Sequence, residues 1–527
     1  MFYYLGFLVF FLAYIYWKIS RRHVERLASK IPGIPDLPII GSTLEILNVG
    51  YSTTPTDTFK KAYDYLTKYG RVIKLWLGPK LVVFLTDPSD VEVILSSKVH
   101  IDKTPEYGFF KPWLGDGLLI STGEKWRAHR KLIAPTFHLN VLKGFMDVFN
   151  VNSRDVVEKL NKEVGREFDV HDYMSEITVE ILLETAMGVS KQNQDQNAFD
   201  YATAVMKMCN ILHLRTLKLW LRSDFIFNLS KYAKSQKKLL NTIHSLTRKV
   251  IKHKKVDYNN GIRGEVPEIV EKDQTKQTVD GLSHGLRDDL DDDDDIGEKK
   301  RMAFLDFMID ASQNQVVISD EEIKEQVDTI MFEGHDTTAA ASSFFLSLMG
   351  IHQDIQDKVF QELDNIFGDS DRKCTFADTL ELKYMERCIM ETLRLYPPVP
   401  LIGRQINEDV KLASGDYTIP KGTSVGIGLF KLHRLEEFFP EPDKFNPDNF
   451  LPEKCANRHY YAFIPFSAGP RSCVGRKYAM LKLKVLLSTI LRNFRMQSNV
   501  EEKDFVLQGD IILKRKDGFR ITVETRK

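Results

Sequence analysis

The sequence lacks the cysteine pairs that would build a disulfide scaffold or a zinc module. Its 527 residues include five cysteines, Cys209, Cys374, Cys388, Cys455 and Cys473, and no two of them form a CxxC pair. An odd number at wide spacing argues against a disulfide framework and against a tetrahedral zinc site. This cysteine usage favours a folded body that faces the reducing cytosol.

An excess of charge of one sign is also missing. The 73 basic and 73 acidic residues cancel, which argues against a dedicated nucleic-acid-binding protein. The hydrophobic content of 43% and the charged content of 28% are those of a globular protein. At this length the chain can bury one large core or two smaller ones.

Charged side chains are absent from the first 17 residues. As a helix this stretch would span roughly 25 Å, close to the bilayer core of about 30 Å. A basic group follows at once: Lys18, Arg21, Arg22, His23 and Arg26. We therefore predict a membrane anchor at residues 1–20, with the body in the cytoplasm. A cleaved signal peptide is disfavoured, because a charged n-region and a small-residue cleavage site are lacking.

Residues 21–50 have the composition of a basic and proline-rich linker. In IPGIPDLPIIG the prolines Pro32, Pro35 and Pro38 stiffen the segment and keep it out of a helix. Such a segment could hold a globular body at the membrane as a rigid strut, and an ordinary linker is equally compatible with it.

Residues 51–527 have the pattern of one mainly helical domain with small β-sheets. RVIKLWLGPKLVVFLTDP predicts a β-hairpin that turns at Gly78 and Pro79. Helical composition continues to about residue 400, and Ser319 with Glu322 marks the start of one of the longest helices. Strand-like sequence follows from 396 to 470, and another helix begins after Gly475. Within this domain, residues 257–300 end in an aspartate run that cannot bury a core, so we expect a mobile acidic surface insertion.

The clearest motif is FSAGPRSCVG, residues 466–475. Glycines such as Gly469 and Gly475 would let this loop lie close to a flat cofactor, and Arg471 could bind a carboxylate of that cofactor. A lone cysteine such as Cys473 is usually a buried structural residue. Here, however, every fixed position of the pattern FxxGxRxCxG is present, which argues against that role. The loop thus resembles that of the cytochrome P-450 superfamily, which implies the cytochrome P-450 fold and haem b with Cys473 as axial ligand of the iron.

The resemblance also assigns supporting residues. Glu391 and Arg394 in ETLR match a buried pair behind the haem, and Asn449 stands where the family usually has an arginine. Trp126, Arg130 and Arg404 match residues that bind the haem propionates, together with Arg471. Each of these motifs is weak alone, and a surface role would be the default for any one of them.

FEGHDTT, residues 332–338, lies within the long helix and predicts oxygen activation. Gly334 would leave room for dioxygen, and Asp336 beside Thr337 supplies an acid and an alcohol for proton delivery. EQVDTIMFEGHDTT resembles the signature of cytochrome P-450 family 4. In that family the glutamate matching Glu333 can form an ester with a haem methyl group.

Other segments resemble the insect G subfamily of family 4: ETAMGVSK, KMCNILHLR, HSLTRKVIK, GLRDDL and the acidic insertion. That resemblance implies oxidative decarbonylation of long-chain fatty aldehydes to hydrocarbons one carbon shorter, with release of CO2, for the cuticle. Terminal (omega) hydroxylation of fatty acids is the alternative for family 4. A haem sensor without enzymatic activity is a third reading, which Asp336 and Thr337 disfavour.

The resemblance implies two partners, NADPH-cytochrome P-450 reductase and a lipid substrate dissolved in the endoplasmic reticulum membrane. It implies no nucleic-acid partner. Electrons must come from outside, because a glycine-rich nucleotide or flavin fingerprint is missing. Arg476, Lys477, Lys482 and Lys484 are candidates for a basic surface that binds the reductase, although a solvated helix face is an equal alternative. A hydrophobic rim that enters the lipid is predicted at Leu219, Trp220, Leu221, Phe225, Ile226 and Phe227.

Overall fold

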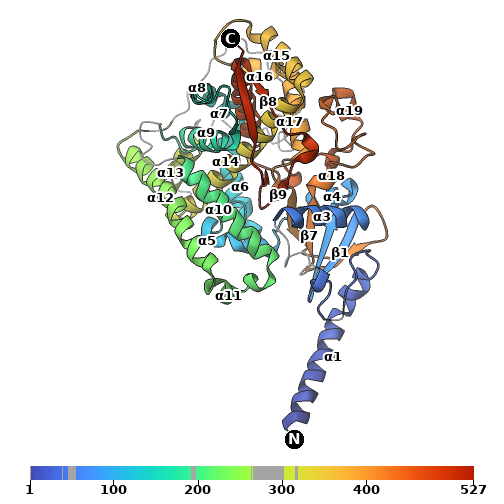
Figure 1. Cartoon of the computed structure of the whole chain (residues 1–527). Coiled ribbons are helices and arrows are strands. Elements are labelled where there is room, and N and C mark those ends of the chain that lie inside the picture. Colours follow the sequence, from blue (N-terminus) through green and yellow to red (C-terminus); the bar gives the residue numbers. More distant parts are fainter. Residues whose placement is uncertain are drawn as a thin grey trace.

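The structure is a computed structural model that describes residues 2–37, 39–45, 55–190, 198–262, 264, 302–314 and 318–526. The aspartate run of the predicted acidic insertion lies outside these residues. Figure 1 shows a helical body, a smaller β-rich part beside it, and a long N-terminal helix that projects away from both.

The helices of the body account for about half of the described chain. They are α3 (Pro55–Lys68), α4 (Pro88–Leu95), α5 (Lys111–Leu114), α6 (Gly123–Ile133), α7 (Leu139–Leu142), α8 (Met146–Asn161), α9 (Val170–Thr185), α10 (Ala198–Leu217), α11 (Asp224–Asn228), α12 (Lys231–Asn259), α13 (Phe304–Gln313), α14 (Asp320–Ile351), α15 (Gln353–Phe367), α16 (Phe376–Glu381), α17 (Lys383–Leu395), α18 (Leu429–Leu432), α19 (Pro452–Ala456) and α20 (Arg476–Asn493). A mainly helical fold is therefore confirmed.

Within the described residues the strands form four small sheets. The largest has the order β1 (Val72–Leu77), β2 (Lys80–Leu85), β7 (Ser424–Gly428) and β4 (Leu401–Gln405). The others are β3 (Phe168–Asp169), β11 (Arg520–Thr525) and β8 (Phe494–Gln497), then β9 (Leu507–Gly509) with β10 (Leu513–Arg515), and β5 (Val410–Lys411) with β6 (Thr418–Ile419). The predicted hairpin is confirmed, because Leu77 pairs with Lys80 around Gly78, whose φ is +56°.

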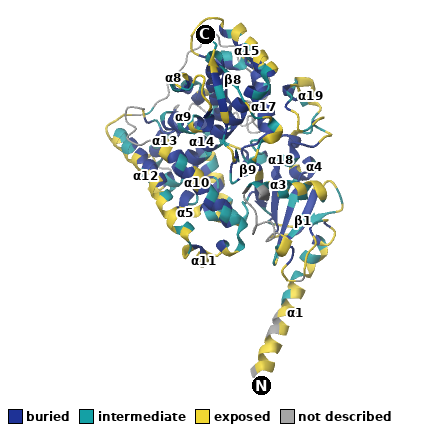
Figure 2. Cartoon of the chain, viewed as in Figure 1, coloured by how far each residue is buried: buried dark blue, intermediate teal, exposed yellow. Residues whose placement is uncertain are grey.

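Helix α14 is the central helix of the body. It begins at the predicted capping box, in which Ser319 and Glu322 satisfy each other's backbone N–H groups, and it runs for 32 residues. The dark core in Figure 2 surrounds it, and most of its residues are buried. The small residues of the run AAASS, 339–343, are all buried and leave space for close packing against neighbouring helices.

Helix α1 (Phe2–Ala28) continues beyond the predicted anchor at 1–20 and includes the basic group. The stretch Tyr3–Ala28 is long and apolar enough to cross a membrane. Its inner end is fastened to the β-rich part, because the Arg21 guanidinium lies 4.6 Å from the ring centroids of both Trp17 and Trp76. The backbone of the proline segment then follows β1, with Lys74 N–H donating to the Pro32 carbonyl at 2.8 Å.

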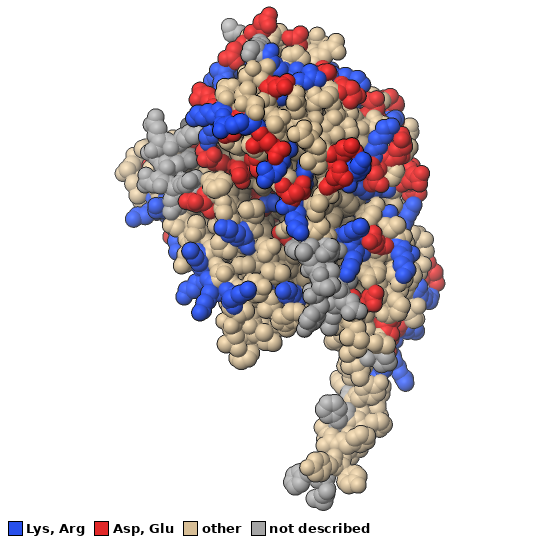
Figure 3. Space-filling model, viewed as in Figure 1, with Lys and Arg blue, Asp and Glu red and all other residues tan. Residues whose placement is uncertain are grey.

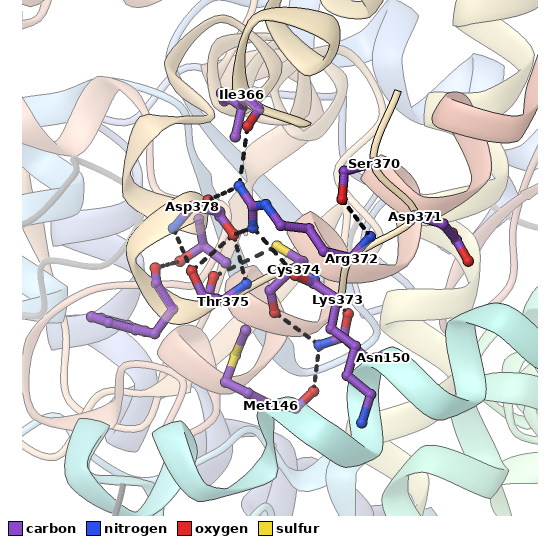
Figure 4. Close-up of polar contacts among 12 residues, drawn as sticks. Met146, Asn150, Ile366, Ser370, Asp371, Arg372, Lys373, Cys374, Thr375 and Asp378 are labelled. Carbon is purple, nitrogen blue, oxygen red and sulfur yellow. Dashed lines mark hydrogen bonds and ion pairs between the residues drawn. The ribbon is translucent and has the colours of Figure 1, made fainter. Parts of the chain in front are cut away.

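The loop between α15 and α16 shows how a buried cysteine is fixed in the body (Figure 4). Asn150 of α8 accepts from the Cys374 N–H and donates to its carbonyl, both at 2.8 Å. Arg372 donates to Asp378 at 2.9 Å, and Asp378 completes the capping box that Thr375 begins. Burial raises the pKa of the Cys374 thiol to about 12, so this cysteine remains a neutral structural group.

Candidate active site

A large cavity of about 690 Å³ lies between α14 and the loop that precedes α20. One wall includes Phe466, Arg471 and Cys473, and the opposite wall includes Glu333, Gly334 and Thr337. Apolar residues extend the cavity to the β-rich part and the α10 end: Ile34, Leu66, Leu75, Phe84, Leu217, Leu219 and Leu401 among others. The predicted thiolate and the predicted oxygen-activating segment therefore line one space.

The Cys473 loop is a tight, backbone-bonded turn. Cys473 N–H donates to the Phe466 carbonyl at 2.9 Å, and Ser467 adopts the left-handed region with φ +61°. Gly469 has φ +70°, and a Cβ there would lie 2.1 Å from the carbonyl oxygen of Leu95. Gly469 therefore permits a close approach to the backbone of α4, which the sequence did not predict, and Gly475 rather than Gly469 lines the cavity.

Cys473 differs from the other four cysteines in its surroundings. Its side chain is exposed to the cavity, whereas Cys209, Cys374 and Cys388 are buried and Cys455 is half-buried. Burial raises the pKa of each of these four thiols. No disulfide joins any of the five cysteines, all of which lie in the described part of the chain.

Several residues in the middle of α14 line the cavity, among them Glu333, Gly334, Thr337 and Thr338. Glu333, Gly334 and Thr337 are half-buried, whereas the surrounding helix is buried almost throughout. Thr337 Oγ1 donates to the Glu333 carbonyl at 2.8 Å, which holds its hydroxyl along the cavity side of the helix. A Cβ on Gly334 would lie 2.9 Å from both methyl groups of Leu182, so this glycine also permits close packing against α9.

The carboxylate of Asp336 points away from the cavity. It is buried and accepts from the Lys514 ammonium of β10 at 2.7 Å. Burial raises its pKa, but Lys514 and His335 outweigh this effect, so the pKa lies below its ordinary value. The structure thus brings Thr337 to the cavity and holds Asp336 behind it as a carboxylate.

A cluster of cations surrounds the Glu333 side of the cavity. Lys103, Arg130 and Arg471 line the cavity, with the Arg471 guanidinium 4.6 Å from the Trp126 ring centroid. Arg471 also donates to the carbonyls of Ile101, Leu118 and Ser121. Burial raises the pKa of Glu333 to about 6, although Lys103, Arg130 and Arg471 each lower it.

Arg404 lies behind the cavity wall. It is buried next to Gly403, which does line the cavity, and its Nη1 donates to the Gly403 carbonyl at 3.0 Å. Its Nη2 is buried without a hydrogen-bond partner among the described residues. Burial together with Arg404 and Arg471 lowers the pKa of Lys103 well below its ordinary value. Together, Lys103, Arg130, Arg404 and Arg471 carry more positive charge than the carboxylate of Glu333 can balance.

This arrangement fits haem. A cavity with a thiol on one wall, an open helix face on the other and a surplus of buried cations suits a flat iron cofactor with two carboxylates. The buried Nη2 of Arg404 supplies a donor that such a carboxylate would satisfy. Lys103 was missed from the sequence, because a single lysine in IDKTPEYG carries no motif.

The predicted network behind the thiolate loop is confirmed. Arg394 Nε and Nη2 donate to the two oxygens of Glu391 at 2.7 and 2.8 Å, and both side chains are fully buried. Asn449 Nδ2 donates to the same carboxylate at 3.1 Å. A further arginine, Arg458, donates to the Asn449 carbonyl and packs on the ring of Phe439. Sequence reasoning missed Arg458, which lies nine positions beyond the expected site.

Two surface predictions need correction. Lys482 and Lys484 are fully buried, so they cannot belong to a basic docking surface, whereas Arg476 and Lys477 are half-buried. Lys484 pairs with Glu386, and Lys482 donates to a carbonyl of α14. The prediction assumed that α20 has one face in solvent. Beyond its first turn, however, α20 is buried on all sides.

The predicted hydrophobic rim is exposed only in part. Trp220, Phe225 and Ile226 are exposed, but Leu221 and Phe227 belong to a small buried cluster. Leu229, which was not predicted, is 76% exposed. The short helices η5 (Leu219–Arg222) and α11 therefore keep one apolar face inside and present the other to the surroundings.

Comparisons with known proteins agree with this site. The sequence profile of the family described as Cytochrome P450 matches residues 31–523. The chain is 58% identical to Cytochrome P450 4g15 of Drosophila melanogaster, over 100% of this chain and 97% of that protein. It is 52% identical to Cytochrome P450 4g1 of the same fly, over 99% and 93%, and 38% identical to human Cytochrome P450 4V2, over 93% and 88%. The chain belongs to the cytochrome P450 family, in its family 4, and is a haem-dependent monooxygenase-type oxidoreductase that draws electrons from a reductase.

Proposed function

We propose that the chain converts long-chain fatty aldehydes to hydrocarbons one carbon shorter. Dioxygen, a pair of electrons and two protons would turn R–CHO into R–H, CO2 and water, so the atoms and electrons balance. Bound haem would supply the activation of dioxygen, for which a thiolate ligand favours O–O cleavage. The proposal is supported by the similarity to the two G-subfamily relatives and by the acidic insertion in the sequence.

The observation that carries a long-chain substrate is the course of the cavity. It runs from Cys473 past apolar side chains to Ile34, six residues after the end of α1, and to Leu219, the first residue of η5, which precedes α11. A hydrocarbon chain could therefore lie along it while its aldehyde stands near Thr337.

A membrane source for the substrate follows from the outer surface. Helices α1 and α11 both lie toward the lower end of Figure 1, and in Figure 3 the projecting outer part of α1 is almost free of charged side chains. Phe225 and Leu229 add exposed apolar surface beside α11. We place the protein on the cytoplasmic face of the endoplasmic reticulum membrane, anchored by α1, with NADPH-cytochrome P450 reductase as the electron donor.

The residues of α14 take separate roles in this proposal. Thr337 would hold a proton donor at the cavity wall, and Asp336 would supply protons from behind the helix. Glu333 faces the cavity and is available for an ester with a haem methyl group. Denaturing chromatography tests this ester. The wild-type protein should retain its haem under denaturing conditions, whereas the Glu333→Gln variant should release it. Equal haem release from both proteins would rule the ester out.

Terminal hydroxylation of fatty acids is the second candidate, and Lys431 is the observation in its favour. This cation of α18 lines the cavity and lies 5.0 Å from the ring centroid of Tyr63 in α3, so it could bind a carboxylate at a part of the wall that the Cys473 loop does not form. Arg222, another cation of the lining, already pairs with Glu106 at 3.3 Å and is less available.

The deciding experiment is product analysis on membranes that contain the protein and its reductase. With NADPH and a long-chain aldehyde we expect a hydrocarbon one carbon shorter together with CO2. Only terminal alcohols from a fatty acid, lost in Lys431→Met, would overturn the proposal in favour of hydroxylation.

A further inference from the structure

One buried cation has no role in the site as described so far. Lys482 lies in α20, nine residues after Cys473, and its side chain is fully buried. Among the described residues it makes no ion pair with a carboxylate, and burial alone lowers its pKa to about 7. Burying an amine without a counter-charge is costly, so its single strong contact is of interest.

That contact reaches the oxygen-activating helix. Lys482 Nζ donates to the carbonyl of Gly334 at 2.8 Å, and the same carbonyl accepts from Thr338 Oγ1 at 3.0 Å. Gly334 and Thr338 both line the cavity, whereas Lys482 does not. The amine therefore holds the wall of the cavity from behind and cannot bind the substrate or the cofactor itself.

The neighbours of Lys482 tie three helices together at this point. Tyr478 of α20 lies under the amine, with 5.0 Å from Nζ to the ring centroid, and its hydroxyl contacts Thr185 Oγ1 of α9 at 2.8 Å. Leu182 of α9 closes the other side of Gly334. The carbonyl of Gly334 is thus fixed between α9 and α20.

We propose that Lys482 is a positioning residue for the oxygenase reaction. It fastens the stretch of α14 that carries Glu333 and Thr337 to the helix that begins at the thiolate loop. One side chain thereby sets the spacing between the two walls of the cavity. The inference rests on the proposed oxygenase chemistry, but not on whether the substrate is an aldehyde or an acid.

Lys482→Met removes the donor and keeps the length of the side chain. In hydrogen–deuterium exchange of the haem-loaded protein, we expect amides of residues 334–338 to exchange about tenfold faster. Per bound haem, the fraction of NADPH that ends in product should fall by about tenfold or more, with hydrogen peroxide formed instead and KM little changed. Lys482→Arg, which keeps a donor, should restore part of this coupling.

Lys484→Met is the matched control, because Lys484 is a fully buried lysine of the same helix whose amine donates to Glu386 of α17 and to the Thr379 carbonyl of α16. It should reduce the yield of folded protein without changing exchange at 334–338 or coupling per haem. Unchanged exchange and coupling in Lys482→Met, or equal changes in both variants, would overturn the proposal. Because exchange needs no substrate, this result is independent of any failure to find hydrocarbon product.

Discussion

Asn449 offers a quantitative test of the network behind the thiolate loop. Its side chain is 2% exposed and donates one hydrogen bond to the Glu391 carboxylate. Asn449→Ala removes that donor, but the same oxygen keeps Arg394 Nη2 and the Asn446 N–H at 2.8 Å each. The loss should therefore be that of one charge-assisted bond, about 1.5–2 kcal/mol in the free energy of unfolding.

Glu391→Gln should cost more, about 3–5 kcal/mol, because Arg394 would then be a buried charge without its counter-ion. Denaturant unfolding of the haem-loaded variants, followed by the haem absorbance, measures both losses. The exposed Asn457, which donates to the Glu453 carbonyl, supplies the control Asn457→Ala with a change below about 0.5 kcal/mol. An Asn449→Ala loss as large as that of Glu391→Gln, or none at all, would refute the assigned roles.

Three further predictions follow from buried charges. Lys254 and Asp306 form a buried ion pair at 2.8 Å that joins α12 to α13. Lys254→Met should therefore lower the free energy of unfolding by about 3–5 kcal/mol, because it leaves Asp306 buried without its partner. A loss below about 1 kcal/mol would contradict this. Lys514→Met should raise the pKa of Asp336 and move the acid limb of the kcat profile to higher pH, whereas an unchanged profile would separate Asp336 from turnover. Burial, with nearby arginines, lowers the pKa of His433 from 6.5 to about 3, so between these values the unfolded chain binds a proton that the folded chain does not. Stability is then full above about pH 6.5 and falls with decreasing pH by about 1.4 kcal/mol per unit; His433→Gln should flatten this slope, and an equal slope in both proteins would contradict the assignment.

The residues of the thiolate loop could be predicted because chemistry restricts them. A thiolate on a flat cofactor requires a cysteine with a defined turn around it, and FSAGPRSCVG carries both. The capping box at Ser319 and the hairpin at Gly78 were also predictable, since both depend on local backbone requirements.

The orientation of side chains on α14 and α20 could not be predicted in the same way. Asp336 and Thr337 are neighbours in sequence, but the helix turns them to different sides, and the partner that holds Asp336 comes from Lys514 in a distant strand. Lys482 and Lys484 resemble a solvated basic face, and only tertiary packing shows that they are buried. Lys103 reaches the cavity through the fold alone.

The central claim is that Cys473 holds haem in the cavity beneath α14. The most direct test is the difference in absorbance when carbon monoxide binds to the reduced, haem-reconstituted protein. The wild type is compared with Cys473→Ala and, as the control at the half-buried cysteine, with Cys455→Ala. We predict a thiolate-type spectrum for the wild type and Cys455→Ala, and its complete loss in Cys473→Ala. A thiolate-type spectrum that survives in Cys473→Ala would contradict the account.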